Sequence, residues 1–370
     1  MRLYFVAGEA SADNHGAALM KALRRSNVDL KFLGRGGPQM KAVAGAPFNN
    51  WIDKSGVLGL WEVVKHYGYF RKQFADTLAE ITQSKPDAVV LIDYPGFNLR
   101  LACALHGKKR ARKIIYYISP QVWAWNRGRI TKIARWIDLM LCIFPFEPEL
   151  YREAGLRAVF VGHPMIDRLR ERKIDIERDP NLIALLPGSR LREVRKIFPV
   201  LIETARDLRK VKPDLRFETA AASPKLAATM KEMWHRQDVD ATIKTGETAE
   251  LMQRASVGII ASGSATLEAA HFRLAFVLVY KVACPTYLAA RLVVSVKYLG
   301  MPNVIAGREV VPEFIQHRAR PRAIAQAVLR LLNDKTARDR MISNFDAVIA
   351  SLGAGGASER AAKAILDELA

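Results

Sequence analysis

The chain has 370 residues, 50% of them hydrophobic, and a formal net charge of +20 at pH 7. No apolar stretch approaches the roughly 20 residues that span a bilayer, and Gly8, Glu9 and Asp13 interrupt the N-terminal apolar run too early for a secretory signal. Length and composition therefore argue against a membrane-spanning or exported protein. We expect a cytoplasmic chain of two domains with an anionic partner.

The first predicted element is a strand at residues 3–6, which leads through small residues into a helix. The same arrangement recurs after a second predicted strand, at residues 182–186. A helix that begins after such a loop offers unpaired N–H groups to an anion. The two copies predict two nucleotide-binding half-folds in one chain.

Residues 57–74 predict an amphipathic helix in which Trp61 and several aliphatic residues alternate with Lys65, Arg71 and Lys72. Aromatic and basic residues in this mixture are typical of a helix that lies on an anionic membrane surface. A helix that packs on the protein's own sheet shows a similar pattern. The sequence leaves both interpretations open.

A predicted strand at residues 88–92 ends directly before Asp93. Ligands of open α/β sheets bind at the carboxyl ends of the strands. A carboxylate in this place is suited to act as a general base. Asp93 could equally cap the helix that is predicted to start near Phe97.

The loop after the next predicted strand, 113–118, combines tryptophans with polar and basic residues. This composition makes a poor core segment and a suitable wall for a sugar or an acyl group. The alternative is that a tryptophan packs between domains, because tryptophan is usually buried. The candidate residues are Gln121, Trp123, Trp125 and Arg127.

Strands and helices alternate through both halves of the chain, which predicts two parallel sheets covered by helices. The first half has strands at 3–6, 88–92, 113–118, 139–143 and 158–161, with helices at 74–84 and 99–106. The second half has strands at 182–186, 217–221, 241–244, 257–261 and 275–279. We expect Rossmann-like domains at 1–167 and 181–312, a charged linker at 168–180, and only helices from 313 to 370.

Two loops of the second half predict a site for a nucleoside diphosphate. A fixed guanidinium and helix-start N–H groups can clamp phosphate oxygens, and a carboxylate one turn into a helix can accept hydrogen bonds from ribose hydroxyls. Taken singly, either loop could be an ordinary turn or cap. The candidate residues are Gly188, Ser189 and Arg190 in one loop and Ser262, Gly263, Ser264, Thr266 and Glu268 in the other.

The basic residues are dispersed along the chain, and many of them are expected on solvated faces. No helix-turn-helix, zinc-finger or RNA-recognition motif accompanies them, so we do not expect nucleic acid as the partner. The anionic partner that we expect is therefore a membrane surface or a phosphorylated substrate.

The chain resembles lipid-A-disaccharide synthases, which are inverting transferases of the glycosyltransferase B fold, with two Rossmann-like domains. Matching segments follow one another through almost the whole chain. They are AGEASAD (7–13), GGPQM (36–40), LIDYPGFN (91–98), SPQVWAW (119–125), FPFE (144–147), FVGHP (160–164), LPGSR (186–190), SGSATLE (262–268) and MPNVIAGRE (301–309).

The resemblance implies that UDP-2,3-diacylglucosamine reacts with 2,3-diacylglucosamine 1-phosphate to give a β-1,6-linked disaccharide 1-phosphate and UDP. It implies that Asp93 is the base, that Arg190 and Asn303 serve donor binding or catalysis, and that Glu268 holds the ribose. Glu9, Ser11 and Asp13 would line a loop that faces the donor.

Further expectations concern cofactors and partners. Arginine and helix N-termini can stabilise a departing diphosphate without a metal, so we expect neither a metal nor a cofactor. The acylated substrates suggest a peripheral protein on the cytosolic face of the inner membrane. The resemblance also suggests a homodimer, and the glycines at 353–356 permit the C-terminal segments to pack on the first domain or to exchange between subunits.

The sequence departs from the family pattern at two positions. Ala12 stands where the family usually has glycine, and a positive φ there would strain the backbone. Asn126 stands where the family commonly has a basic residue, at a position that the resemblance associates with the acceptor phosphate.

Two other functions are compatible with parts of this sequence. A UDP-sugar epimerase, or a transferase to another lipid acceptor, would share the half-folds but not the AGEASAD and SPQVWAW segments together. A basic RNA-binding or membrane-binding module without catalysis would gain no thermal stability from UDP.

Overall fold

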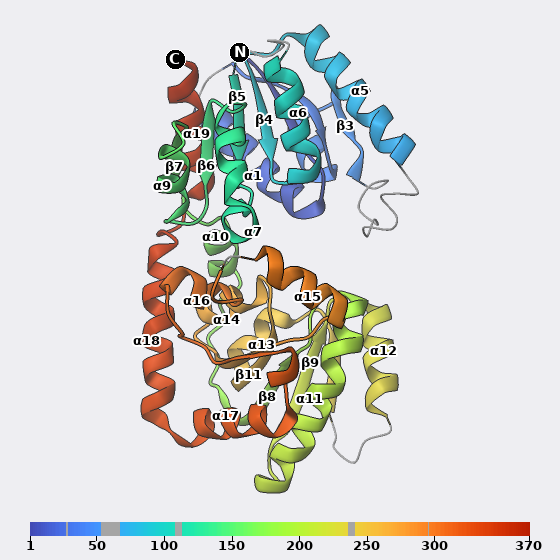
Figure 1. Cartoon of the computed structure of the whole chain (residues 1–370), viewed down its shortest axis with the longest axis vertical. Coiled ribbons are helices and arrows are strands. Elements are labelled where there is room, and N and C mark those ends of the chain that lie inside the picture. The colour runs from blue at the N-terminus through green and yellow to red at the C-terminus, as the bar shows by residue number, and fades with distance from the viewer. Residues whose placement is uncertain (27–28, 53–66, 108–112, 236–240, 295) are drawn as a thin grey trace. The chain divides into compact units, whose positions relative to one another are not determined.

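The computed structural model describes residues 1–26, 29–52, 67–107, 113–235, 241–294 and 296–370 (Figure 1). The chain forms two compact units: Met1–Pro164 with Leu352–Ala370, and Met165–Ser351. The chain thus passes between units near 164 and near 352, whereas the sequence pattern placed domain boundaries at 167 and 312. Part of the expected linker is regular structure, because a helix occupies Met165–Arg170 and a strand begins at Asp179.

Unit 1 contains a seven-stranded sheet in the order β3-β2-β1-β4-β5-β6-β7, in which all neighbours are parallel. Burial of nearly all the residues of β1, β4, β5 and β6 agrees with the continuous apolar runs that predicted them. The strands are β1 Arg2–Ala7, β2 Lys31–Gly36, β3 Phe48–Asn50, β4 Ala88–Ile92, β5 Lys113–Tyr117, β6 Leu139–Cys142 and β7 Arg157–Phe160.

The strands β2 and β3 were not predicted from the sequence. Residues 31–36 read KFLGRG, which lacks an apolar run. Gly34 has a φ of +130°, and a Cβ there would lie 2.0 Å from the carbonyl oxygen of Phe5 in β1. The close approach of the two backbones requires a glycine at position 34, although a glycine in the sequence usually indicates the end of a strand.

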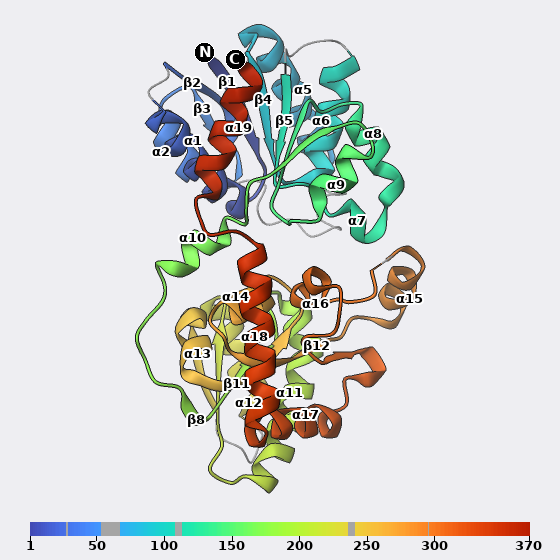
Figure 2. The same cartoon turned by 90° about the vertical axis from the view of Figure 1, so that its left-hand side faces the viewer.

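Helices cover both faces of this sheet. On one face Tyr4 and Leu91 share a buried cluster with Ile81 of α5 and Leu101 of α6. On the other face Gly16 of α1 lies against Ile92, and α1 packs on α19, which Figure 2 shows beside it. The helices are α1 Ala10–Arg25, α2 Pro38–Ala44, α5 Tyr67–Ser84, α6 Pro95–Gly107, α7 Val122–Trp125, α8 Ile130–Ala134, α9 Glu147–Arg152 and α19 Ala357–Leu369, with the 3-10 helix η1 at Arg127–Arg129.

Unit 2 contains a six-stranded parallel sheet in the order β10-β9-β8-β11-β12-β13. Its strands are β8 Asp179–Leu186, β9 Arg216–Ala221, β10 Ala241–Thr245, β11 Ala255–Ala261, β12 Ala275–Tyr280 and β13 Glu313–Ile315. Its helices are α10 Met165–Arg170, α11 Leu191–Val211, α12 Pro224–Trp234, α13 Thr248–Arg254, α14 Ala265–His271, α15 Cys284–Val293, α16 Met301–Ala306, α17 Pro321–Asn333 and α18 Lys335–Ser351, with η2 at Gln316–Arg318.

The expectation that only helices follow residue 312 is wrong. Strand β13 adds to the edge of the second sheet, and η2 replaces the helix expected at 314–318. A three-residue edge strand leaves almost no alternating pattern in the sequence, and its pairing with β12 is what identifies it. Beyond it, α17 and α18 belong to unit 2, and α19 returns to unit 1.

Candidate active site

The strand order places one topological switch point in each unit. In unit 1, β1 and β4 are neighbours and their connections leave in opposite directions, with Ala7 paired to Ile92. In unit 2, β8 and β11 have the same relation, with Leu186 paired to Ile260. Such points are where open α/β sheets bind ligands. The residues just beyond these four strand ends are therefore the first candidates for a site.

At the switch point of unit 1, Asp93 and Glu9 lie side by side. Burial, which is the larger cause, and the adjacent Glu9 carboxylate, through repulsion and a hydrogen bond, together raise the pKa of Asp93 to about 6. The N–H of Tyr94 donates to the Asp93 carboxylate and opposes this shift. Asp93 is thus a half-buried acid that becomes a free carboxylate near neutral pH, as a general base requires.

The main chain of Asp93 is held in an unusual conformation. Asp93 and Tyr94 have φ values of +46° and +51°, a region that costs a residue other than glycine about 1–3 kcal/mol. The Asp93 carbonyl accepts hydrogen bonds from Asn98 Nδ2 at 2.8 Å and from the Tyr116 hydroxyl at 2.6 Å. Surrounding side chains therefore fix the direction in which the carboxylate points.

Capping of α6 explains Asp93 less well than the site does. The N–H groups of Phe97 and Asn98 in the first turn of α6 donate to the carbonyl of Tyr94. The ring of Tyr94 packs against Gly8, where a Cβ would lie 2.2 Å from it. The turn is thus satisfied by main chain, and the carboxylate of Asp93 faces Glu9 instead.

The segment after β1 is helical earlier than the sequence suggested. Helix α1 begins at Ala10, so its first turn contains Ser11, Ala12 and Asp13. Ala12 therefore does not have the positive φ that would strain its backbone. The Ser11 hydroxyl donates to Glu9 Oε1 at 2.7 Å. This bond orients the carboxylate that faces Asp93.

Asp13 has a structural role in the described fold. Its side chain is buried, and its two oxygens accept hydrogen bonds from the N–H groups of Gly37, Gln39 and Met40, each at 2.9 Å. These donors belong to the start of α2, so Asp13 caps a neighbouring helix. The arrangement argues against the predicted contact between Asp13 and the donor.

The two tryptophans of the SPQVWAW segment differ in environment. Trp123 is buried, donates from Nε1 to Glu147 Oε1 at 3.0 Å and packs edge-on against Phe146. Trp123 thus packs within unit 1 and offers little exposed surface to a ligand. Trp125 is 41% exposed, and the Arg129 guanidinium carbon lies 5.1 Å from its ring centroid. Trp125, with the exposed Gln121 and Arg127, remains available to a ligand.

At the switch point of unit 2, the loop before α11 is occupied by its own carboxylate. Gly188 has a φ of +109°, and Glu193 Oε2 accepts hydrogen bonds from the N–H groups of Ser189 and Arg190 at 3.2 and 3.3 Å. Arg190 Nη1 reaches Glu193 Oε1 at 3.3 Å, while its side chain is 82% exposed. The donors predicted to clamp a phosphate therefore surround an anionic group already.

The second loop of unit 2 follows β11. Gly263, which has a φ of +154°, and Ser264 are exposed. The Thr266 side chain is buried and its hydroxyl donates to the Gly263 carbonyl at 2.8 Å, so this residue shapes the loop. Ser262 likewise donates to the Leu299 carbonyl at 3.2 Å. Glu268 forms an ion pair with Arg168 at 3.1 Å.

Asn303 lies inside unit 2 with all its polar capacity used. Its side chain is fully buried, and Oδ1 accepts from the N–H groups of Val310 and Val311 at 2.7 and 2.8 Å. Its Nδ2 donates to the Val311 carbonyl and to Glu313 Oε1, both at 2.8 Å. Asn303 fixes the segment that leads into β13, which argues against the predicted direct contact with the donor.

Three carboxylates that hold loops near the strand ends were not predicted from the sequence. Glu193 stands three residues after Arg190, a spacing typical of a helix cap, and that signal could have identified it. Glu313 is recognisable only from its bonds to Asn303 and to the N–H groups of Leu299 and Gly300. Burial raises the pKa of Glu147 to about 7.

The predicted interfacial helix is described in part. Trp61 and Lys65 lie outside the described residues, while Arg71 and Lys72 are exposed on α5. Among the helices of the described residues, none has the length and apolar character needed to cross a bilayer. Within those residues, too, no three His, Cys, Asp or Glu side chains gather as metal ligands would.

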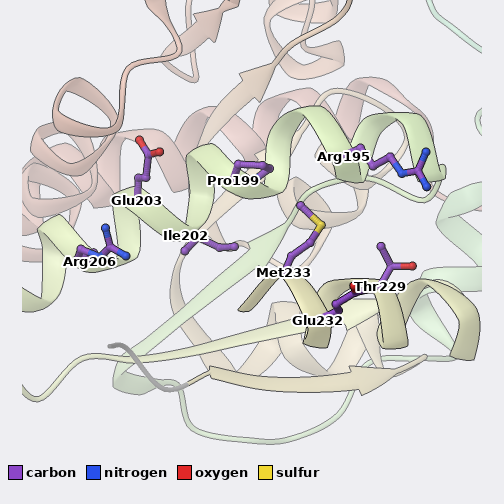
Figure 3. A pocket seen from close by; sticks show the side chains of 8 residues that line it. All are labelled: Arg195, Pro199, Ile202, Glu203, Arg206, Thr229, Glu232 and Met233. Atoms are coloured by element: carbon purple, nitrogen blue, oxygen red, sulfur yellow. The ribbon is translucent and has the colours of Figure 1, made fainter. Parts of the chain in front are cut away.

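A cavity of about 680 Å³ in unit 2 does not lie at a strand end. It lies between α11 and α12, and Figure 3 shows Arg195 and Arg206 on one helix and Thr229 and Glu232 on the other. Its lining carries both signs of charge. We therefore do not place the substrate there.

Comparison with known proteins agrees with the sequence motifs. A family model described as lipid-A-disaccharide synthetase matches residues 3–364. Lipid-A-disaccharide synthase from Geobacter sulfurreducens is 37% identical over 378 residues, covering 100% of this chain and 97% of the relative. Lipid-A-disaccharide synthase 1 from Legionella pneumophila is 37% identical over 364 residues, covering 96% and 94%.

Solved structures confirm the predicted fold. The UDP-GlcNAc 2-epimerase from Neisseria meningitidis bound to UDP-GlcNAc has a TM-score of 0.64 at 12% identity, covering 99% of this chain and 100% of that one. MurG from Acinetobacter baumannii has a TM-score of 0.59 at 14% identity, covering 99% of both chains. At these identities the likeness shows the fold alone, which is the α/β glycosyltransferase B type.

Proposed function

We infer the substrates and the mechanism from one premise: this chain belongs to the lipid-A-disaccharide synthetase family and is a glycosyltransferase of lipid A biosynthesis. We propose that the donor is UDP-2,3-diacylglucosamine and the acceptor 2,3-diacylglucosamine 1-phosphate. The acceptor 6-oxygen bonds to the donor anomeric carbon, the bond from that carbon to the diphosphate breaks, and UDP leaves. The product is the β-1,6-linked disaccharide 1-phosphate.

The pairing of Asp93 with Glu9 is the observation that carries the catalytic proposal. A carboxylate with a pKa of about 6 is ionised at neutral pH and still basic enough to accept the proton of the attacking 6-hydroxyl. The fixed backbone at Asp93 supports a single direction of approach. Glu9 and Ser11 act by positioning Asp93 and by keeping its pKa high.

Donor binding is assigned to unit 2. The N–H groups of Ser189 and Arg190, with the Arg190 guanidinium, are the groups best suited to the diphosphate, because they already hold the Glu193 carboxylate. The exposed Gly263 and Ser264 extend this surface. The Glu268 carboxylate accepts hydrogen bonds from the ribose hydroxyls. Positive charge and oriented N–H groups stabilise the leaving UDP, so the proposed reaction uses neither a metal nor a cofactor.

Unit 1 is assigned to the acceptor and to the membrane. We propose that the protein is peripheral on the cytosolic face of the inner membrane, because its substrates are acylated and the chain has a formal net charge of +20. The exposed Arg71 and Lys72 support contact with an anionic surface. A homodimer remains part of the proposal on the family resemblance alone.

Acceptor-dependent release of UDP by the purified protein tests the function. We expect release that survives EDTA and falls by about 10²–10⁴ in Asp93→Asn, the range for loss of a general base. Absence of release from folded wild type would contradict the substrates. Release that Asp93→Asn leaves intact would contradict the base alone, and release that EDTA abolishes would contradict the metal-free mechanism.

A further inference from the structure

A second cavity, in unit 1, lies between α6 and the η1–α8 segment and has a volume of about 430 Å³. Its wall on α6 includes Leu99 and Arg100, which follow Pro95 by four and five residues, a little more than one helical turn. Across from them lie Ile133 and Trp136. Leu99 and Ile133 also belong to the buried core of the unit, so the floor of the pocket is fixed and apolar.

The pocket begins beside the proposed base. Pro95 and Gly96 line one end of it and follow Asp93 by two and three residues. A Cβ added to Gly96 would meet no atom within 4 Å, so this end is open. On the other wall, Arg129 reaches into the lining while its guanidinium stacks on the exposed Trp125. The pocket thus joins the Asp93 turn to the SPQVWAW segment.

The charge of the lining is one-sided. Arg100, Arg129 and Lys132 line the pocket and are exposed. No carboxylate lines it, and none of these three cations has an ion pair in the described part of the chain. Three unpaired cations above an apolar floor suit a ligand that carries an anionic head and a hydrocarbon chain.

We propose that this pocket binds the acceptor, with the phosphate against Arg100 and Lys132 and the beginning of an acyl chain on Leu99, Ile133 and Trp136. This inference rests on the proposed function, since it names the acceptor of that reaction. It also accounts for Asn126, because Arg129, three residues on, supplies a positive charge beside Trp125. The phosphate contact holds the acceptor while its 6-hydroxyl reaches Asp93.

Cys103 gives a direct measure of occupancy. It is an exposed, free thiol that lines the pocket, whereas Cys142 is buried. We expect diacylglucosamine 1-phosphate at ten times its Kd to slow alkylation of Cys103 by N-ethylmaleimide about tenfold, by mass action. Peptide mapping by mass spectrometry assigns the modification to Cys103. UDP alone should leave the rate unchanged.

Three further probes identify the source of protection. Inorganic phosphate and diacylglucosamine without its phosphate should each protect much less than the complete acceptor. Vesicles of phosphatidylglycerol that protect as well as the acceptor would overturn the assignment in favour of a membrane phospholipid. Lack of protection in a preparation that releases UDP with acceptor would overturn the pocket and leave the function standing. Protection without any release of UDP would support the pocket and contradict the function.

The second test measures the kinetics of a double variant in which two basic residues of the pocket are replaced by neutral glutamine. Arg100→Gln with Lys132→Gln should raise the acceptor KM about tenfold or more, because a hydrogen bond to a charged group is worth about 1.5–3 kcal/mol. The donor KM and the thermal unfolding temperature should not change. Lys21→Gln with Lys41→Gln removes the same charge from exposed sites on α1 and α2 and should leave the acceptor KM unchanged. An equal rise of the acceptor KM in the two double variants would overturn the proposal.

Discussion

At the scale of single residues, neighbours decide what a side chain can do. Asp93 is suited to proton transfer because burial and Glu9 raise its pKa. Asn303 was expected to serve the donor, yet all its donors and acceptors are used within unit 2. Both residues stand in family motifs, and both were predicted from the sequence to belong to the active site. Only the contacts separate a reactive group from one that supports the fold.

The raised pKa of Asp93 predicts the pH dependence of the reaction. The group must be ionised to accept a proton, so kcat/KM should fall as the pH drops through about 6. Glu9→Gln removes a negative neighbour, which lowers the pKa of Asp93, and the acid limb should move to lower pH. A pH–rate profile of both proteins measures this. An acid limb that Glu9→Gln does not move would contradict the coupling.

At the scale of elements, helix starts in the two units meet anions in different ways. Helix α2 is capped by the buried Asp13 of another helix. Helix α11 is capped by its own Glu193, near an exposed arginine. A cap from within the same turn can be displaced without disturbing the packing of the sheet. This difference favours α11 as the start that exchanges its carboxylate for a diphosphate.

Glu193→Gln tests that exchange. The substitution removes a negative charge from the place proposed for the diphosphate, so the donor KM should fall several-fold. The helix loses part of its cap, and the free energy of unfolding should drop by about 0.5–1 kcal/mol. Steady-state kinetics and chemical denaturation measure the two effects. A higher donor KM would show that Glu193 assists binding.

The exposed basic residues of α5 test the membrane proposal. Arg71→Glu with Lys72→Glu should release the protein from anionic vesicles, because each basic residue near such a surface contributes about 1 kcal/mol. Arg24 is unsuitable as a control because it stacks on Phe32, so Lys21→Glu with Lys41→Glu serves instead. Vesicle sedimentation gives the bound fraction. Unchanged binding would contradict the role of α5.

At the scale of the whole molecule, the chain closes unit 1 with its last helix. The buried face of α19 includes Ala361 and Ile365. Glu368 pairs with Lys113 of β5 at 2.7 Å and with Arg157 of β7 at 2.6 Å. Arg360 donates to the Val161 carbonyl at 2.9 Å. The fold of unit 1 therefore depends on residues that the sequence places after unit 2.

Deletion of residues 353–370 should destabilise unit 1 selectively. The loss exposes apolar surface on α1 and leaves Lys113 and Arg157 without Glu368, so the transition of unit 1 should move to lower temperature by several degrees. The transition of unit 2 should stay in place. Differential scanning calorimetry with and without UDP identifies unit 2 as the transition that UDP raises. If the deletion left both unfolding temperatures unchanged, unit 1 would not depend on α19.

The sequence by itself determined the features that depend on neighbours along the chain. Apolar runs gave most of the strands, and the motifs gave the family and the position of Asp93 at a strand end. The tertiary structure decided what depends on pairing between distant segments: that β1 lies beside β4, so that Glu9 faces Asp93, and that β2 needs Gly34 where it approaches β1. It also decided that Asn303 is saturated and that α6 and α8 enclose a basic pocket. A periodic pattern records which face of an element is buried, but which element covers that face is set by packing of the whole chain.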